Sequence, residues 1–143
     1  MIVKSIPAAF ACLAALFGAS AVGANPIQLG SSVFVERMKA ESRVLEPARA
    51  LVSGDRIVTV LTWKRATPGG QFTVANALPR GLYYQGSASD EEEVSIDGGR
   101  TWGKLGQLRV GTRFATAEDV THVRWRVQSQ SATGRIAYSA IVR

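Results

Sequence analysis

The sequence predicts an all-β fold, an antiparallel β-sandwich, and three observations support this prediction. From residue 33 onward, short runs rich in β-branched and aromatic residues alternate with turns that contain Gly, Pro or Asp. These runs amount to about seven to eight strands, which is the usual number in a sandwich. No long segment shows the 3.6-residue hydrophobic period of a helix. A parallel α/β fold needs crossover helices, so the pattern favours antiparallel sheets.

The N-terminal segment predicts a signal peptide that precedes the fold. Lys4 supplies a positive charge, residues 6–22 carry none, and small residues lead up to Ala24. Cleavage after Ala24 is the preferred prediction, and cleavage after Ala21 is the second choice. The alternative is an uncleaved anchor, but this apolar run is short for a membrane span of about 20 residues. The predicted organisation is a signal peptide at 1–24, a short leader at 25–32 and a sandwich domain at 33–143.

Composition narrows the function of the mature chain. The one cysteine, Cys12, lies in the predicted signal peptide, so we expect no disulfide, no cysteine-ligated metal and no thiol nucleophile. The whole chain has 17 Lys and Arg against 11 Asp and Glu, a net charge of +6. The basic residues are spread over residues 37–143 instead of forming a cluster, which argues against a nucleic-acid partner.

The first part of the domain is compatible with two local structures. Residues 33–38 are a candidate strand, whereas residues 36–50 contain Glu, Arg, Met, Lys and Ala, which favour a helix. Pro47 interrupts any such helix. We therefore prefer a strand, a turn and a second strand here.

The clearest strand covers residues 56–64 and follows a turn at 53–55. Its β-branched residues disfavour a helix. Apolar residues fall on both parities, which predicts a central strand covered on both faces. Further strands are expected after the turns at 68–70 and 79–81, at residues 71–75 and 82–85.

Two strands near the C-terminus show clean alternation. In residues 120–128, Val123, Trp125 and Val127 share one face, and the opposite face carries His122, Arg124 and Arg126. Residues 135–142 alternate in the same way, so both strands are expected to bury one face.

Two short motifs resemble a bacterial Ig-like conserved repeat, a domain of unknown function in surface and cell-wall proteins. Residues 47–63 resemble its opening P-G-D-x-h-x-Y segment, and residues 76–84 resemble its D-x-L-P-x-G-h-x-Y segment. Residues 95–102 and 119–126 look like stand-alone exported members in proteobacteria. The resemblance implies an Ig-like sandwich with a structural or adhesive role and carries no catalytic residues. Ser53 replaces the usual Pro, so the turn there departs from the family pattern.

Residues 95–102 (S-I-D-G-G-R-T-W) match the S-x-D-x-G-x-T-W Asp box of sialidase-type propellers. In that box the Asp carboxylate binds the turn backbone and the Trp packs beneath the hairpin. One box in a chain of this length is too little for a propeller. We therefore predict a structural turn built from Asp97, Gly98, Gly99 and Trp102, with glycan contact as the alternative.

The polar residues give weak signals for metal binding or catalysis. Residues 90–93 form an acidic run that suits Ca²⁺ by its oxygen ligands, but consecutive extended residues point to opposite sides. A solvated loop is the preferred interpretation. His122, the one histidine, has Asp119 nearby, yet no G-x-S-x-G nucleophile elbow and no phosphate-binding loop occurs. We predict no enzyme activity, no metal and no cofactor.

The aromatic residues are compatible with either a core or a sugar-stacking platform. Their positions on strands favour a core, with Tyr83 and Tyr84 on opposite faces so that one is exposed. The six residues are Trp63, Trp102, Trp125, Tyr83, Tyr84 and Tyr138. The candidates for binding a partner are Arg124 and Arg126 on their outward face, together with Tyr83.

Taken together, these patterns predict an exported, non-catalytic structural or adhesion module of the bacterial cell envelope. Its partner is expected to be an envelope protein or a glycan, and the mature form is expected to have no membrane span. The alternative is a carbohydrate-binding accessory module that uses exposed aromatics and a basic face. Periplasm, cell surface and medium all remain open as locations.

Overall fold

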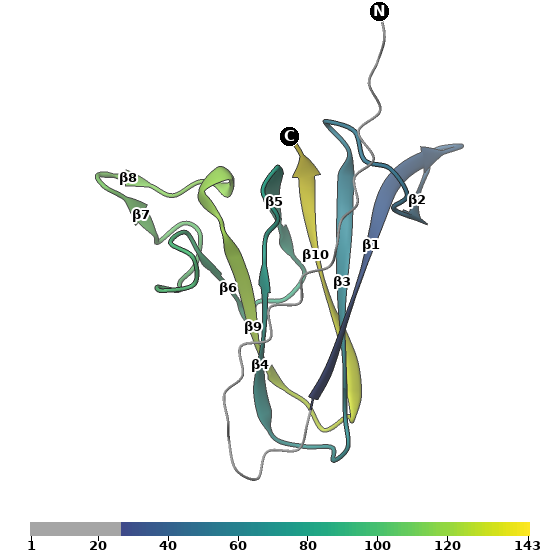
Figure 1. Cartoon of the computed structure of the whole chain (residues 1–143), viewed down its shortest axis with the longest axis vertical. Coiled ribbons are helices and arrows are strands. Elements are labelled where there is room, and N and C mark those ends of the chain that lie inside the picture. The colour runs from purple at the N-terminus through teal and green to yellow at the C-terminus, as the bar shows by residue number, and fades with distance from the viewer. Residues whose placement is uncertain (1–26) are drawn as a thin grey trace, which may run out of the picture.

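A computed structural model of the chain describes residues 27–143, which form an antiparallel β-sandwich (Figure 1). Within this range one sheet has five strands in the order β2-β1-β3-β10-β5, and the other has three in the order β4-β9-β6. The predicted all-β antiparallel fold is confirmed. A two-stranded hairpin, β7-β8, adds to the seven or eight strands that we expected.

The strands of the five-stranded sheet are β1 (Ile27–Lys39), β2 (Ser42–Pro47), β3 (Arg56–Arg65), β10 (Thr133–Val142) and β5 (Leu82–Ser87). Those of the three-stranded sheet are β4 (Gln71–Ala77), β9 (His122–Gln128) and β6 (Glu92–Ser95). The small hairpin joins β7 (Arg109–Val110) to β8 (Arg113–Phe114), and a 3₁₀ turn, η1, spans Ala117–Asp119. No helix among residues 27–143 is long and apolar enough to cross a membrane.

Strand β1 starts earlier than the sequence predicted. We expected a leader at 25–32, but residues 27–32 already pair with β3, beginning with Ile27 opposite Arg65. Their side chains are exposed, so the sequence shows no alternation there, and backbone pairing holds the segment instead. Gly30 permits the close approach, because a Cβ at this position would lie 2.7 Å from Thr62 Oγ1. The predicted signal peptide, with Cys12 and both cleavage points, lies outside the described residues.

The interpretation of residues 36–50 as strand, turn and strand is confirmed. β1 ends at Lys39, and Ala40 and Glu41 turn the chain with φ values of 45° and 68°. β2 then runs back along β1 and ends at Pro47. Proline is tolerated there because β2 is an edge strand.

Strand β3 is central within its sheet, as predicted, but only one of its faces is buried. It lies between β1 and β10. Ile57 and Leu61 point inward and are buried, whereas Val58 and Val60 on the outer face are half-buried. Cover on both faces was therefore a wrong prediction, since the second sheet covers the inner face alone. The outer β-branched residues fit the extended backbone without needing burial.

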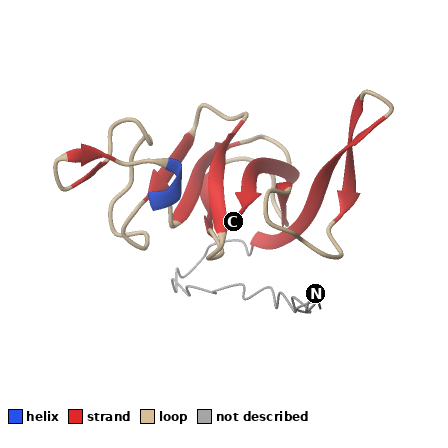
Figure 2. Cartoon of the chain, turned by 90° about the horizontal axis from the view of Figure 1, so that it is seen from above, coloured by secondary structure: helices blue, strands red, loops and turns tan. Residues whose placement is uncertain are grey.

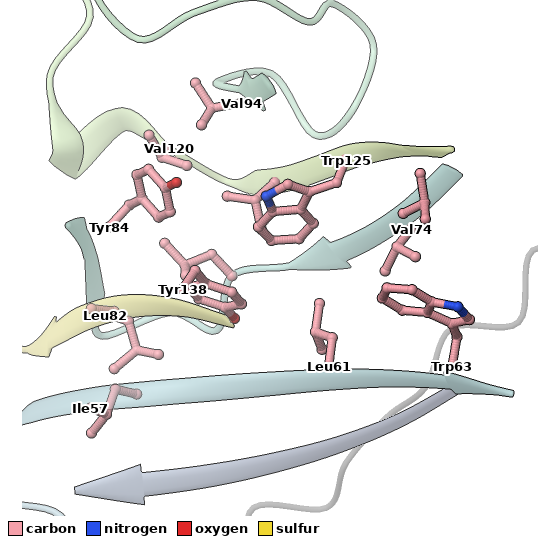
Figure 3. Close-up of a cluster of buried hydrophobic side chains, with 14 of the residues drawn as sticks. Ile57, Leu61, Trp63, Val74, Leu82, Tyr84, Val94, Val120, Trp125 and Tyr138 are labelled. Carbon is pink, nitrogen blue, oxygen red and sulfur yellow. The ribbon is translucent and has the colours of Figure 1, made fainter. Parts of the chain in front are cut away.

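The core lies between the two sheets and confirms the faces predicted for β9 and β10. Trp125 of β9 is 1% exposed and stacks on Tyr138 of β10, with ring centroids 5.9 Å apart (Figure 3). Trp63 of β3 meets Phe72 of β4 edge to face at 5.6 Å. These contacts place β9 over β10 and β4 over β3.

Two hairpins project from opposite ends of the sandwich, the β1–β2 hairpin and the β7–β8 hairpin (Figures 1 and 2). Each carries exposed apolar side chains. They are Met38 and Leu45 on the first hairpin, and Val110 and Phe114 on the second. These two hairpins therefore carry apolar surface outside the core.

Candidate functional site

The predicted turn after β6 is built around the carboxylate of Asp97. Its Oδ1 accepts hydrogen bonds from Ser95 Oγ at 2.8 Å and from the Thr101 N–H at 2.9 Å. The Arg100 N–H donates to the same oxygen at 3.1 Å, and Thr101 Oγ1 donates to Oδ2 at 2.6 Å. These donors, with the Thr101 hydroxyl first among them, hold the pKa of Asp97 well below its usual range.

The other three predicted turn residues shape the backbone of the same turn. Gly98 and Gly99 have φ values of 79° and 89°, which a β-branched residue adopts only with strain. Trp102 folds back and its Nε1–H donates to the Gly99 carbonyl at 3.0 Å. The chain after the turn meets β6 only at the Val94–Gly103 bridge, and the strand that pairs with β6 in the sheet is β9.

The predicted partner-binding residues lie on two different faces. Arg124 is on the outer face of the three-stranded sheet, where its Nε donates to Glu93 Oε2 at 2.7 Å. Its guanidinium also lies over the Trp102 ring, 4.5 Å from the centroid. Arg126 is exposed, 3.8 Å from the same Glu93 carboxylate. Glu93 therefore offsets part of the positive charge of this face.

Tyr83 belongs to the opposite outer face. Its neighbours in β5, Leu82 and Tyr84, are buried in the core, so Tyr83 points away from the second sheet. The Arg143 guanidinium covers its ring at 3.9 Å. The structure thus separates Tyr83 from Arg124 and Arg126.

The acidic run at 90–93 does not converge on one point. Asp90 and Glu91 are exposed in a turn, and Glu92 and Glu93 belong to β6. Among residues 27–143, no group of three or more His, Cys, Asp or Glu side chains is arranged to hold a metal ion. The solvated-loop interpretation thus fits the first two residues, while Glu93 pairs with Arg124.

Asp119 and His122 have separate partners. Asp119 accepts two hydrogen bonds from Arg113, at 2.7 and 2.8 Å, which keep the pKa of this carboxyl well below its usual range. His122 Nδ1 lies 3.1 Å from Thr121 Oγ1, and its ring meets Trp102 edge to face at 6.4 Å. Both residues thus support local structure near η1 and the Asp97 turn.

A surface hollow at the β1–β2 hairpin was not predicted from the sequence. Its volume is about 460 Å³, within the size range of ligand pockets. The hollow is lined by Val35, Arg37, Glu46, Pro47, Arg49 and Ala50. We call this feature the arginine hollow, because two of its three charged lining residues are arginines.

Asp55 holds Arg37 in place beside the arginine hollow. Asp55 is 7% exposed and receives both Arg37 Nη atoms, Nη1 on Oδ1 and Nη2 on Oδ2 at 3.3 Å. The Val52 N–H donates to the same carboxylate at 3.0 Å. The Arg37 hydrogen bond lowers the pKa of Asp55, and the same bond raises the pKa of Arg37. The guanidinium is therefore fixed before any ligand arrives.

The other charged residues of the arginine hollow differ in whether they have an ion-pair partner. Glu46 forms an ion pair with Lys39, which lowers the pKa of Glu46. Arg49 is exposed and has no ion-pair partner among residues 27–143. Pro47 and Ala50 are exposed and form an apolar wall of the hollow. An apolar wall beside the Arg49 guanidinium suits a ligand that carries a carboxylate.

Sequence reasoning missed the arginine hollow because its members come from separate segments. Arg37 and Asp55 are 18 residues apart, and only the pairing of β1 with β3 brings them together. One local signal was present: Asp55 directly precedes the strongest predicted strand and follows Gly54, whose φ is 90°. An acid at such a turn often caps backbone amides.

Comparison with protein-family models, curated proteins and solved structures finds no match to this chain. The resemblance to the Ig-like conserved repeat therefore rests on its short motifs. The class of protein that the fold itself defines is an all-β antiparallel sandwich.

Proposed function

We propose that this chain is an exported, non-catalytic interaction module of the bacterial cell envelope that binds its partner through the arginine hollow. The observation that carries the proposal is the fixed position of Arg37, which the buried Asp55 holds beside an apolar wall. A donor that is already oriented loses little freedom on binding, so more of the contact energy appears as affinity.

Export is supported by the N-terminal pattern and by where the fold begins. Lys4, the uncharged run and the small residues before Ala24 form the features that a signal peptidase reads. β1 starts at Ile27, so cleavage after Ala24 or Ala21 leaves every described strand intact. Release of residues 1–24 is therefore compatible with the sandwich that residues 27–143 form.

A non-catalytic role is supported by what the carboxylates do. Asp55, Asp97 and Asp119 have lowered pKa values because donors of the same chain stabilise their ionised forms. A general acid or base at neutral pH works best with a pKa near 7, and these shifts run in the opposite direction. Structural support is the role that such shifts fit.

The carbohydrate-binding alternative has weaker support. The ring face of Trp102 is covered by Arg124, and Arg143 covers that of Tyr83. The remaining candidate aromatics are buried: Trp63, Trp125, Tyr84 and Tyr138. The aromatic surface available for sugar stacking is therefore small.

Photo-crosslinking in the cells that produce the protein tests the proposal. Ala50, an exposed lining residue with no charge to lose, is replaced by benzoylphenylalanine, and Thr73, exposed on the other sheet, receives the same residue as a control. We expect a discrete crosslinked species in the envelope fraction from position 50 and not from position 73. Equal crosslinking from both positions, or none from position 50, would contradict binding at the arginine hollow.

A further inference from the structure

We propose that the ligand of the arginine hollow is an acidic peptide in extended conformation, which adds as a strand to the free edge of β2 and places a carboxylate against Arg49. This inference rests on the proposed function and names the chemistry of its partner. It combines two features that adjoin each other, the edge strand and the hollow beside it.

The first feature is the free backbone edge of β2. β2 ends the five-stranded sheet and pairs with β1 alone among the described strands. The Ala48 N–H donates to the Val33 carbonyl at 3.0 Å, so the even-numbered residues before it direct their amides toward β1. The N–H and C=O groups of Arg43 and Leu45 therefore point away from the sheet. An extended peptide satisfies such groups by strand addition.

The second feature is the position of the arginine hollow beside this edge. Val35 is opposite Glu46 and Arg37 is opposite Val44, so these four side chains share the inner face of the hairpin. A peptide strand paired with β2 would direct alternate side chains to the same face. A Glu side chain on that face, near the end of β2, would extend toward Arg49, which lines the hollow together with Glu46 and Pro47.

The charges of the hollow favour a carboxylate over a neutral group. Asp55 offsets the charge of Arg37, because both Arg37 Nη atoms donate to its carboxylate. Arg49 is the guanidinium of the hollow that has no ion-pair partner among residues 27–143, and Glu46 is paired with Lys39. An acidic sugar also carries a carboxylate, but it has no backbone amides to match the β2 edge. The edge therefore favours a peptide.

The test begins with a random heptapeptide library displayed on phage and selected on the purified mature protein. We expect enrichment of β-branched residues that alternate with Glu or Asp. The best sequence is then synthesised with a dye and compared, by fluorescence anisotropy, with a copy in which Gln replaces each acid. We expect the acidic peptide to bind at least about tenfold more tightly, as a bidentate Arg–carboxylate pair warrants. Selected peptides without acidic residues, or equal affinity of the acidic peptide and its Gln copy, would contradict binding through a carboxylate.

Variants locate the binding. Arg49→Gln is expected to lower the affinity for the acidic peptide by about tenfold and to leave the affinity for the Gln peptide unchanged. Arg135→Gln, at an exposed arginine of β10, is the matched control and is expected to change neither. A loss of equal size in both arginine variants would indicate long-range charge attraction and would refute the site.

A chemical change in the peptide tests strand addition without altering the protein. Methylation of alternate backbone nitrogens on one side of the peptide removes the amides that would pair with β2. We expect methylation of one alternate set of backbone nitrogens to abolish binding and methylation of the other set to preserve it. Binding that survives both methylations would contradict strand addition. If no peptide is selected while position 50 still crosslinks in the envelope, the peptide is the wrong chemistry and the proposed function stands; if crosslinking fails as well, both fail.

Discussion

Arg65, at the end of β3, is a buried cation whose partners are main-chain carbonyls. Its Nε and one Nη donate to the Ser131 carbonyl at 3.2 and 3.0 Å, and its other Nη donates to the Gly69 carbonyl at 2.7 Å. The Ser129 carbonyl accepts a further bond. The guanidinium also lies 5.0 Å from the centre of the Phe72 ring. Arg65 thereby ties the turn after β3 to the turn before β10.

Arg65→Met is expected to destabilise the fold by about 2–3 kcal/mol, because the carbonyls of Gly69, Ser129 and Ser131 lose a charged donor. Urea unfolding at neutral pH measures the loss. Arg65→Lys should recover little of it, since one ammonium group does not span carbonyls on two turns. Arg135→Met, at an exposed position, is the control and should stay within about 0.5 kcal/mol of the parent. A parent-like urea midpoint for Arg65→Met would contradict this role.

Trp125 and Arg124 are adjacent in β9 and face opposite sides, so they compare a core contact with a surface contact. Trp125→Ala should cost about 3–5 kcal/mol, because a large buried ring stacked on Tyr138 leaves a cavity. Arg124→Ala should cost about 0.5–1 kcal/mol, the usual value of an exposed cation–π contact such as the one with Trp102. Equal and small losses in urea unfolding would show that the faces of β9 are assigned wrongly.

The turn between β6 and Trp102 depends on backbone conformations that few residues adopt. Gly98→Val should destabilise the protein by about 1–3 kcal/mol, because φ is 79° at this position. Gly106→Val is the matched control, since a Cβ there also meets open space but φ is not positive. Thermal unfolding of both variants measures the difference. If Gly106→Val loses as much stability as Gly98→Val, the positive φ of Gly98 does not explain the loss.

Local patterns predicted some elements well and others poorly, for physical reasons. The Asp97 turn was predictable because the donors to its carboxylate all lie within residues 95–102. The first residues of β1 were not, because an exposed strand held by backbone pairing shows no hydrophobic alternation. The prediction that both faces of β3 are covered was wrong for a related reason, since β-branched residues favour strands whether or not their side chains are covered.

The arginine hollow and the role of Arg65 depend on contacts between distant segments. The Arg65 bonds reach residues 64 to 66 positions away, and the Arg37–Asp55 pair requires the register of β1 against β3. Neither spacing follows from a local rule. The separation of Tyr83 from Arg124 and Arg126 is likewise a matter of which sheet each strand joins. The fold class was thus accessible from the sequence, while the hollow required the topology.

Acid should destabilise the whole sandwich through its bound carboxylates. Asp55, Asp97 and Asp119 have folded-state pKa values below those of the unfolded chain, so their stabilisation is fully present above about pH 4. It is lost as pH falls through the folded-state values, because the unfolded state then binds more protons. We expect the urea midpoint to fall steadily from pH 5 to pH 2, and the fall to be smaller in Asp119→Asn. A urea midpoint that does not change with pH over that interval would contradict the stabilisation of these ionised carboxylates in the folded protein.

The proposed export places the chain outside the cytoplasm without its first 24 residues and with every described strand retained. N-terminal sequencing of the protein recovered from the periplasm, the envelope or the medium tests it most directly. The expected first residue is Asn25, with Val22 as the second choice, just ahead of β1 at Ile27. A membrane-bound form that retains Met1 would contradict both the cleavage and the release of the domain.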